Sequence, residues 1–268
     1  MAERTGFNIR RQTGFATIAV ACFVLLYLPI LLLVAYSFNS GSSIAIWEGF
    51  SWRWYQSAWE NELVQEATVR SLVIAVWASL ISTTVAVLAA LATTRTRKFK
   101  GQGAVFAMIN QPLMVPEIVT AVALLIFFAM IKVATGYSGL LYLIIAHAAF
   151  CIPFAYLPIR ARLQGMDLSL EQAAADLYAT PFQAFRRITL PQLWPGILAG
   201  AMLAFVISLD DVVITEFVKS AGQDTLPTYM LGQLRRVITP EINAISTVLI
   251  GISVTMVIGF TLLSKIRN

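Results

Sequence analysis

Charged residues are scarce in this sequence. Asp, Glu, Lys and Arg make up 12% of its 268 residues, whereas a soluble globular domain carries about a quarter. Apolar residues make up 58%, and the mean hydropathy is +0.76. So little charge cannot cover an ordinary water-exposed surface. The composition therefore predicts that lipid is the main solvent of the chain.

Residues that carry catalytic or metal chemistry are also rare. The two cysteines, Cys22 and Cys151, lie in apolar runs, which predicts small buried side chains rather than a disulfide framework. The single histidine, His147, also lies in an apolar run, and we expect it to be a hydrogen-bonded packing residue rather than a ligand. The sequence contains neither an H-E-x-x-H motif nor a G-x-x-x-x-G-K-[ST] phosphate-binding loop. We therefore expect the chain to hold no metal and no cofactor, and not to bind ATP by itself.

The net charge of +5 is not distributed as in a nucleic-acid-binding protein. The basic residues stand in short clusters between apolar runs, without a basic face interleaved with aromatic residues. Such clusters encode the orientation of membrane proteins. If the N-terminus is inside, most Lys and Arg residues fall in cytoplasmic segments, so both termini are expected in the cytoplasm. Nucleic acid is not an expected partner.

Long apolar runs are what the sequence has in abundance. Each is long enough to cross a bilayer, which takes about 20 residues, and a helix satisfies its own backbone hydrogen bonds in hydrocarbon. The first run is too long for a signal peptide and has no convincing cleavage site, so we expect an uncleaved first helix. The sequence thus predicts an all-α polytopic membrane protein with about six transmembrane helices. The runs lie near residues 15–38, 68–94, 104–131, 139–159, 193–218 and 242–263.

Four prolines fall inside these runs. Pro112 and Pro116 lie in the third run, and Pro153 and Pro158 in the fourth. Proline removes a backbone donor and clashes with the preceding turn, so these helices should kink or break. Broken helices are typical of transport pathways, although proline is also common in ordinary membrane helices.

The first segment expected outside is rich in aromatic residues: Trp47, Trp52, Trp54, Tyr55 and Trp59. Indole rings favour the headgroup level of a bilayer. This segment is therefore expected either to lie on the outer membrane interface or to pack against the helices.

The longest polar stretch on the expected cytoplasmic side is the loop at 160–192. Ser169 and Gln172 fit a capping box, which predicts the start of a short helix. Thr180 followed by Pro181 predicts a second start, because proline suits the first helical position. The loop thus indicates two short helices joined by a sharp turn, and an apolar stripe on the first helix could fill a groove on a partner or pack on its own bundle. The stripe consists of Leu170, Ala173, Ala174 and Leu177.

The same loop resembles the E-A-A motif of ABC importer permeases. The family pattern is E-A-A, three residues, Gly, nine residues and I-x-L-P, and the spacing here agrees throughout. The resemblance implies that the loop is the coupling helix, which docks into a groove on the ATPase subunit. Gln172 replaces the Glu of the motif, and Tyr178 replaces the Gly. At the Gly position, either Tyr178 accepts left-handed backbone strain or the first helix ends differently from the family pattern. The coupling residues implied are Gln172, Ala173, Ala174, Leu177, Tyr178, Ile188, Leu190 and Pro191.

A second resemblance narrows the group. The chain is similar to the second permease of spermidine/putrescine importers in several short stretches. They are 116–119 (P-E-I-V), 208–213 (S-L-D-D-V-V), Pro227 downstream of it, and 239–244 (T-P-E-I-N-A) before the last span. This resemblance covers essentially the whole chain and implies a small cationic solute, although related permeases serve other solutes.

Three acidic residues lie within membrane runs. Asp210 and Asp211 fall in the fifth run and Glu117 in the third. A charge at mid-membrane costs about 2.5–3.5 kcal/mol on insertion scales, so such residues usually face a cavity or a partner charge. We expect at least one of the three to line the substrate pathway. The alternatives are that they cap a broken helix or pair with a basic residue of a second permease.

Together these features predict a single transmembrane permease domain over 1–268 with type I ABC importer (MetI-like) architecture, in a bacterial inner membrane. The resemblance implies a heterodimer with a second permease, two ATP-binding subunits that use ATP and Mg, a periplasmic substrate-binding protein, and membrane lipid around the helices. The chain itself is then a transport subunit and not an enzyme. An ATP-independent channel and an intramembrane enzyme using Asp210 or Asp211 are the alternatives from other classes.

Overall fold

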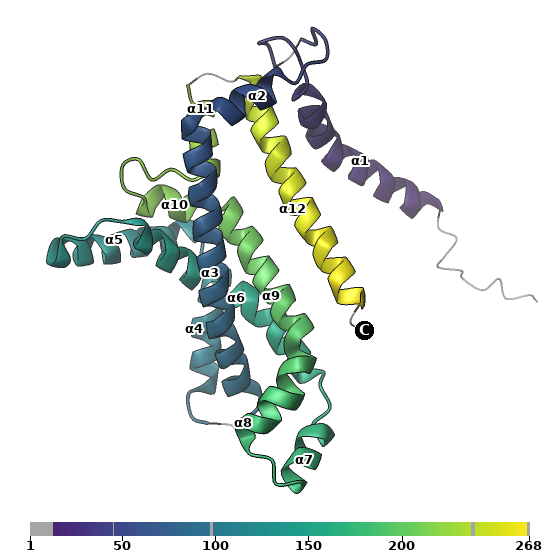
Figure 1. Cartoon of the computed structure of the whole chain (residues 1–268), viewed down its shortest axis with the longest axis vertical. Helices are drawn as coiled ribbons and strands as arrows, with labels where there is room; N and C mark the ends of the chain where they lie inside the picture. The colour runs from purple at the N-terminus through teal and green to yellow at the C-terminus, as the bar shows by residue number, and fades with distance from the viewer. Residues whose placement is uncertain (1–12, 45, 97–98, 237–238, 267–268) are drawn as a thin grey trace, which may run out of the picture. The chain divides into compact units, whose positions relative to one another are not determined.

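The computed structural model describes residues 13–44, 46–96, 99–236 and 239–266 (Figure 1). Within these ranges the regular structure is helical, apart from a single antiparallel bridge between Asn39 and Phe50. The helices are α1 (Thr13–Tyr36), α2 (Arg53–Glu60), α3 (Glu62–Thr94), α4 (Gln102–Met114), α5 (Glu117–Thr135), α6 (Leu140–Gln164), α7 (Ser169–Asp176), α8 (Pro181–Ala184), the π-helix η2 (Phe185–Thr189), α9 (Leu190–Asp210), α10 (Val213–Val218), α11 (Leu226–Leu234) and α12 (Pro240–Ile266).

Six helical segments of the described chain are long and apolar enough to cross a membrane. They confirm the prediction of an all-α polytopic protein, because each contains one of the apolar runs or most of one. The segments are Gly14–Tyr36, Glu62–Thr94, Glu117–Thr135, Leu140–Gln164, Pro181–Asp210 and Pro240–Gly259.

The described chain falls into two compact parts, of which the first comprises 1–60 and 236–250. Its helix α1 buries none of its most apolar window within the chain. The aromatic segment after α1 forms its own cluster, in which Phe38 stacks on Phe50 at 5.3 Å and meets Trp52 edge-on at 4.9 Å between ring centroids. Phe50 and Trp52 remain exposed. The rings therefore pack on one another and still present an open aromatic surface.

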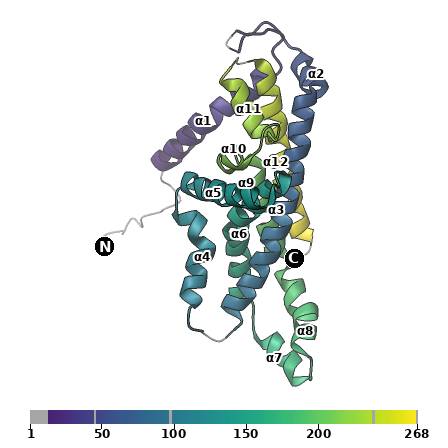
Figure 2. The ribbon, with the colours of Figure 1, turned by 90° about the vertical axis from the view of Figure 1, so that its left-hand side faces the viewer.

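The second part comprises 61–235 and 251–268. Its core is a bundle in which α3, α6 and α9 pack pairwise, around fully buried side chains such as Leu143, Tyr156 and Leu193. α7 and α8 lie at one end of this bundle, and α10 and α11 lie towards the other (Figures 1 and 2). The bundle therefore separates the predicted coupling loop from the acidic residues near the end of α9.

Small residues allow the three helices to approach closely. The face of α3 that is buried is almost entirely Ala, Ser and Thr, and Ser79 donates a 2.6 Å hydrogen bond to the carbonyl of Ala201 on α9. On α9, Gly196 and Gly200 lie one turn apart, and a Cβ on Gly200 would stand 2.7 Å from the carbonyl oxygen of Ala155 on α6. Close backbone contact of this kind is how helices pack in lipid, where apolar side chains gain little from meeting each other.

Two of the predicted spans are interrupted. α4 ends at Met114 and α5 begins at Glu117, so the predicted break at Pro116 is confirmed, and α5 turns sharply away from α4 (Figures 1 and 2). The fourth run is not broken, because α6 continues through both Pro153 and Pro158. The fifth run breaks instead after Asp210, where no proline stands.

The glycine contact yields a test of the bundle. Gly200→Ala forces a Cβ against the Ala155 carbonyl, so α6 and α9 must separate, and overpacking of this kind costs about 1–3 kcal/mol. We expect a lower thermal unfolding temperature in detergent. Gly251→Ala on α12 is the matched control, because a Cβ there meets nothing within 4 Å. Equal unfolding temperatures for the two variants would contradict this packing.

Candidate functional site

The first helix of the predicted coupling loop, α7, begins differently from the prediction. Ser169 does not form a capping box with Gln172. Instead Asp167 accepts hydrogen bonds from the Ser169 hydroxyl at 2.7 Å and the Ser169 amide at 2.9 Å. The Ser169 hydroxyl and amide hold the pKa of the Asp167 carboxyl below its ordinary value. The Gln172 amide, which a capping box would pair with the Ser169 hydroxyl, donates instead to the Leu168 carbonyl at 3.0 Å.

The turn after α7 accepts the strain that the sequence raised as one of two possibilities. Tyr178 has φ 60 and is the non-glycine residue with positive φ among those described. Its amide donates to the Ala175 carbonyl at 2.9 Å, and the Ala179 amide donates to Ala174 at 3.0 Å. This pair of bonds is a Schellman motif, which ordinarily uses Gly at the position of Tyr178. The helix therefore ends as it would with Gly, although a tyrosine is present.

The second helix of the loop is not a separate short helix as predicted. It starts at the predicted signal, where Thr180 and Gln183 form a capping box with bonds of 3.0 and 3.3 Å. It then passes through the π-turn of η2 into α9 without interruption. The predicted second helix is thus the first turn of the fifth span.

Glu171 holds the two arms of the loop together. Its Oε1 lies 3.2 Å from Arg95 Nε at the end of α3 and accepts a 2.9 Å hydrogen bond from Thr189. Sequence reasoning assigned no role to Glu171, although it directly precedes the Gln172 that replaces the acid of the motif. The acidic side chain of this loop, Glu171, thus stands one residue before the Glu position of the motif, and it bonds to residues of the same chain.

Most of the predicted docking stripe is exposed. Leu177 is 81% exposed and Tyr178 96%, and Ala173 is exposed as well, whereas Ala174 is buried. Among the remaining predicted coupling residues, Ile188 and Leu190 are half-buried, and Gln172 and Pro191 are exposed. Phe182, which was not among the predicted residues, is 70% exposed. The loop presents apolar side chains that its own bundle does not cover.

The acidic residues lie at the break between α9 and α10. Asp210 ends α9 and is exposed, whereas Asp211 adopts an extended conformation (φ -65, ψ 130) and is buried. Asp211 Oδ1 accepts a 3.0 Å hydrogen bond from the Thr215 amide, so the side chain caps the first turn of α10. Because the helix is interrupted here, the two aspartates face different surroundings.

Asp211 also has a free oxygen. Its Oδ2 is buried, and no residue of the described chain hydrogen-bonds to it. The half-buried carboxyl of Glu117, at the start of α5, neighbours the Asp211 carboxyl. Asp211 and Glu117, two of the three acids predicted for the pathway, are therefore neighbours, and each lies at a break in a different span. The third acid, Asp210, is exposed.

The match to a family model is decisive here. Residues 82–266 match the family described as binding-protein-dependent transport system inner membrane component. The chain belongs to this family. It is accordingly a transport permease and a multi-pass protein of the inner membrane, as predicted.

Curated proteins with similar sequences align with most of the length of this permease. It is 39% identical over 232 residues to the putrescine transport system permease protein PotI of Escherichia coli (strain K12), covering 85% of this chain and 83% of that protein. It is 37% identical over 246 residues to the spermidine/putrescine transport system permease protein PotC of Haemophilus influenzae, covering 92% and 94%.

Solved structures show the same fold. A bacterial alginate ABC transporter in complex with its alginate-bound periplasmic protein contains a chain that aligns with a TM-score of 0.72 at 16% identity, covering 94% of each chain. A chain of the MetNI methionine ABC transporter aligns with a TM-score of 0.62 at 17% identity, covering 81% of this chain and 97% of that one. The type I ABC importer architecture predicted from the sequence is confirmed.

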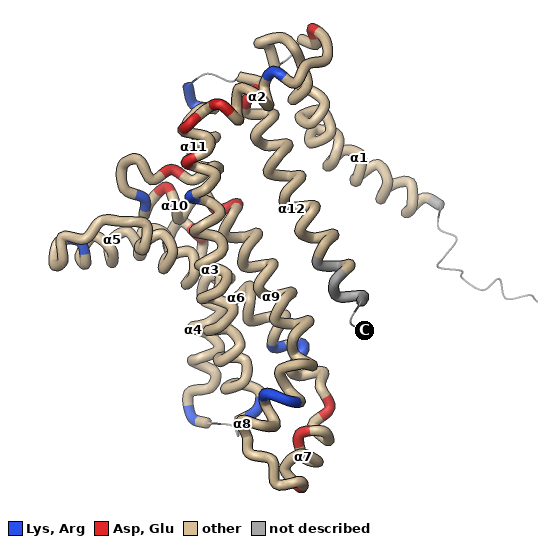
Figure 3. The backbone as a smooth tube through the Cα atoms, in the orientation of Figure 1, with Lys and Arg blue, Asp and Glu red and all other residues tan. Residues whose placement is uncertain are grey.

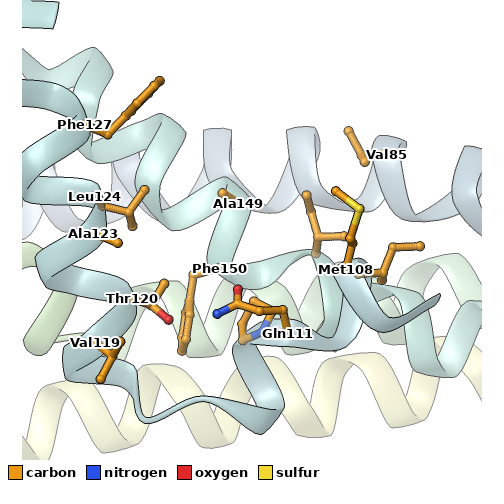
Figure 4. Close-up of a pocket in the computed structure, with 13 residues that line it drawn as sticks. Val85, Met108, Gln111, Val119, Thr120, Ala123, Leu124, Phe127, Ala149 and Phe150 are labelled. Carbon is orange, nitrogen blue, oxygen red and sulfur yellow. The ribbon is translucent and has the colours of Figure 1, made fainter. Parts of the chain in front are cut away.

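A cavity of about 560 Å³ lies in the second part of the permease. Residues of α5 form one side, residues of α4 another, and Ala149 and Phe150 of α6 lie between them (Figure 4). Its wall is mostly apolar, with the Gln111 amide and the Thr120 hydroxyl as polar groups. Asp210, Asp211 and Glu117, the acidic residues predicted for the pathway, are not among the residues that line it.

The strained turn yields a test. Tyr178→Gly removes the left-handed strain and no buried contact, so we expect the purified permease to gain about 0.5–1 kcal/mol of stability. Leu177→Gly is the matched control: its φ of -86 is ordinary and its side chain is also exposed. That change should cost about 0.5–1 kcal/mol. Chemical denaturation measures both, and a loss of stability in Tyr178→Gly would show that the turn is not strained.

Proposed function

We propose that this permease forms one of the two membrane subunits of an ATP-driven importer that moves polyamines, spermidine or putrescine, into the cytoplasm. The observation that carries the substrate class is the meeting of Asp211 and Glu117 at two helix breaks. Relatives named as putrescine and spermidine/putrescine permeases, at 35–39% identity, support it. The exposed Asp210 stays a candidate for the same pathway.

The chemistry of the site suits an alkyl ammonium group. Primary amines resemble the lysine side chain and are protonated at neutral pH. Two carboxyl groups in hydrocarbon are costly unless a proton or a cation is shared between them. An ammonium group leaving water would recover hydrogen bonds from the free Oδ2 of Asp211 and from Glu117. Long polyamines could then pass one amine at a time.

Neutralising the acids tests the pathway. In proteoliposomes holding the complete importer, Glu117→Gln and Asp211→Asn should each lower polyamine uptake by about tenfold or more, since the lost charge is poorly replaced by water. Asp210→Asn should have a smaller effect, because its carboxylate is exposed. The yield of assembled complex separates a structural defect from a transport defect.

Normal uptake by both Glu117→Gln and Asp211→Asn, in intact complexes, would remove this pair from the pathway. A wild-type importer that moves another solute and neither polyamine would refute the substrate class and leave a permease of the same family for a different solute. The relatives do not favour a channel without ATP or an intramembrane enzyme.

The partners follow from the family and the coupling loop. We propose a heterodimer with a second permease, two ATP-binding subunits that hold ATP and Mg²⁺, and a periplasmic substrate-binding protein. The open apolar residues Leu177, Tyr178 and Phe182 support docking of this loop to the ATP-binding subunit, because exposed apolar patches mark interaction sites. The exposed length of α1 requires lipid or the second permease as a cover.

We also propose that both termini face the cytoplasm. Figure 3 shows several Lys and Arg segments at the end of the second part that carries α7 and α8, and others on α5 and near α10 and α11. Basic residues are enriched on the cytoplasmic side of membrane proteins. The same end would meet the ATP-binding subunits, which agrees with the proposed role of the loop.

A charge on the docking face tests the coupling role. Ala173→Asp places a carboxylate on the exposed stripe of α7, so the ATP-binding subunit should be lost on co-purification and uptake should fall by about tenfold or more. Ala175→Asp is the control, because this residue is equally exposed and points to the opposite side of the helix. If Ala173→Asp retains both the subunit and uptake, this stripe is not the docking surface.

A further inference from the structure

A buried hydrogen-bonded chain crosses the break between α9 and α10. His147, on α6, is 2% exposed. Its Nδ1 lies 2.8 Å from the hydroxyl of Ser208 on α9, and its Nε2 lies 2.9 Å from the hydroxyl of Thr215 on α10. One imidazole ring thus bonds to a residue on each side of the break. A buried neutral imidazole has one donor and one acceptor nitrogen, and these two contacts satisfy both of them from opposite sides of the break.

The direction of the hydrogen bonds follows from Asp211. A carboxylate oxygen only accepts, so the Thr215 hydroxyl, 3.2 Å from Asp211 Oδ1, donates to it. The Thr215 oxygen is then the acceptor for Nε2–H of His147. In the neutral ring the other nitrogen, Nδ1, must accept, so Ser208 donates to it. The chain therefore runs from Ser208 through His147 and Thr215 and ends on Asp211 Oδ1.

This chain occupies one oxygen of Asp211 and leaves the other. Oδ1 receives the Thr215 amide and hydroxyl, and His147 Nε2 lies 3.5 Å away. Oδ2 is buried and has no hydrogen-bond partner among the described residues, and the Glu117 carboxyl neighbours this carboxyl. A carboxylate held through one oxygen cannot rotate freely, so the free oxygen has a fixed direction.

We propose that His147 is a positioning residue of the substrate pathway: it holds the α9–α10 break and, through Thr215, fixes Asp211 so that its free oxygen and Glu117 together receive one ammonium group of the solute. This inference rests on the proposed polyamine function. His147 does not touch the solute. It acts through Asp211, and its removal matters because an unfixed carboxylate pays ordering entropy when the cation arrives.

The test compares two substitutions of His147 that keep different halves of the ring. His147→Gln places an amide near the position of Nε2 and can still donate to Thr215, whereas His147→Asn reaches only the position of Nδ1 near Ser208. Initial rates of putrescine uptake are measured in proteoliposomes holding the complete importer, over a range of concentrations of loaded binding protein. We expect uptake within about threefold of wild type for Gln and lowered by about tenfold for Asn. Equal losses in the two variants would indicate packing alone and overturn the proposal.

A double-mutant cycle asks whether His147 acts through Asp211. In the Asp211→Asn background, His147→Asn should change uptake by less than about twofold, because the positioned charge is already gone. Cys151→Ala is the matched control. Cys151 lies one turn along α6, is fully buried and bonds the Ala204 carbonyl of α9, but it is not part of the chain to Asp211. Its effect should be the same in both backgrounds. Independent, multiplying effects of His147→Asn and Asp211→Asn would refute the role.

A second pair of variants keeps the test decisive if His147→Asn does not assemble. Thr215→Ser retains the hydroxyl that links His147 to Asp211, and Thr215→Val retains the shape without it. We expect near-normal uptake for Ser and about tenfold lower uptake for Val, with equal complex yields. Equal uptake in the two would overturn the proposal while leaving the polyamine function intact. A wild-type importer that carries neither polyamine would overturn the proposed function and this inference with it.

Discussion

Hydrocarbon offers no hydrogen-bond partners, and the whole structure of this permease follows from that constraint. Each span must pair its own backbone groups, so the described membrane segments are helices. Helices in lipid gain little from apolar contacts between them, so they associate through close backbone approach and short polar bonds. Gly200 against Ala155 and Ser79 against Ala201 are the two forms of that solution in the core of α3, α6 and α9.

The same constraint decides where a span can break. Breaking a helix frees amides and carbonyls that must find partners within the protein. After Asp210 the Asp211 carboxylate accepts the freed Thr215 amide, and His147 links the side-chain hydroxyls of Ser208 and Thr215 across the break. At Val115–Pro116 the break is less demanding, because proline has no amide hydrogen to satisfy. One span thus breaks at Pro116, which has no amide hydrogen to pair. The other breaks at Asp211, whose carboxylate accepts the amide hydrogen that the break leaves free.

This difference explains what could be predicted from the sequence. The break at Pro116 was predictable because proline acts locally, on its own turn. A break near Asp210 entered the sequence analysis only as an alternative, in which the acids cap a broken helix. The contacts of His147 across this break lie about sixty residues away in sequence, and no local signal predicts them. The acids Asp211 and Glu117 were found by the cost of charge in the membrane, yet their meeting depends on how two spans pack.

The coupling loop shows the same limit at smaller scale. Its position, length and second start at Thr180 were predictable from spacing and capping rules. The capping box predicted for α7 was wrong, because the Ser169 hydroxyl donates to Asp167 just upstream and the Gln172 amide bonds to the Leu168 carbonyl. Tyr178 shows that a family position can keep its backbone conformation after losing its glycine. The loop could be identified from its resemblance to the family. The bonds of Glu171 to Arg95 and Thr189 could be found only in the folded structure, because these residues are distant in sequence.

The continuous helix from Pro181 to Asp210 has a mechanical consequence. At a rise of about 1.5 Å per residue, this segment is a rod about 45 Å long, with the proposed docking loop at one end and the break beside Asp211 at the other. A tilt of about 10° around its midpoint displaces each tip by about 4 Å, which exceeds the length of any hydrogen bond at Asp211. The π-turn of η2 is an irregular joint along this length, and Pro195 lies inside α9 beyond it. Stiffness of that joint would set how much of a push on the loop arrives at the break.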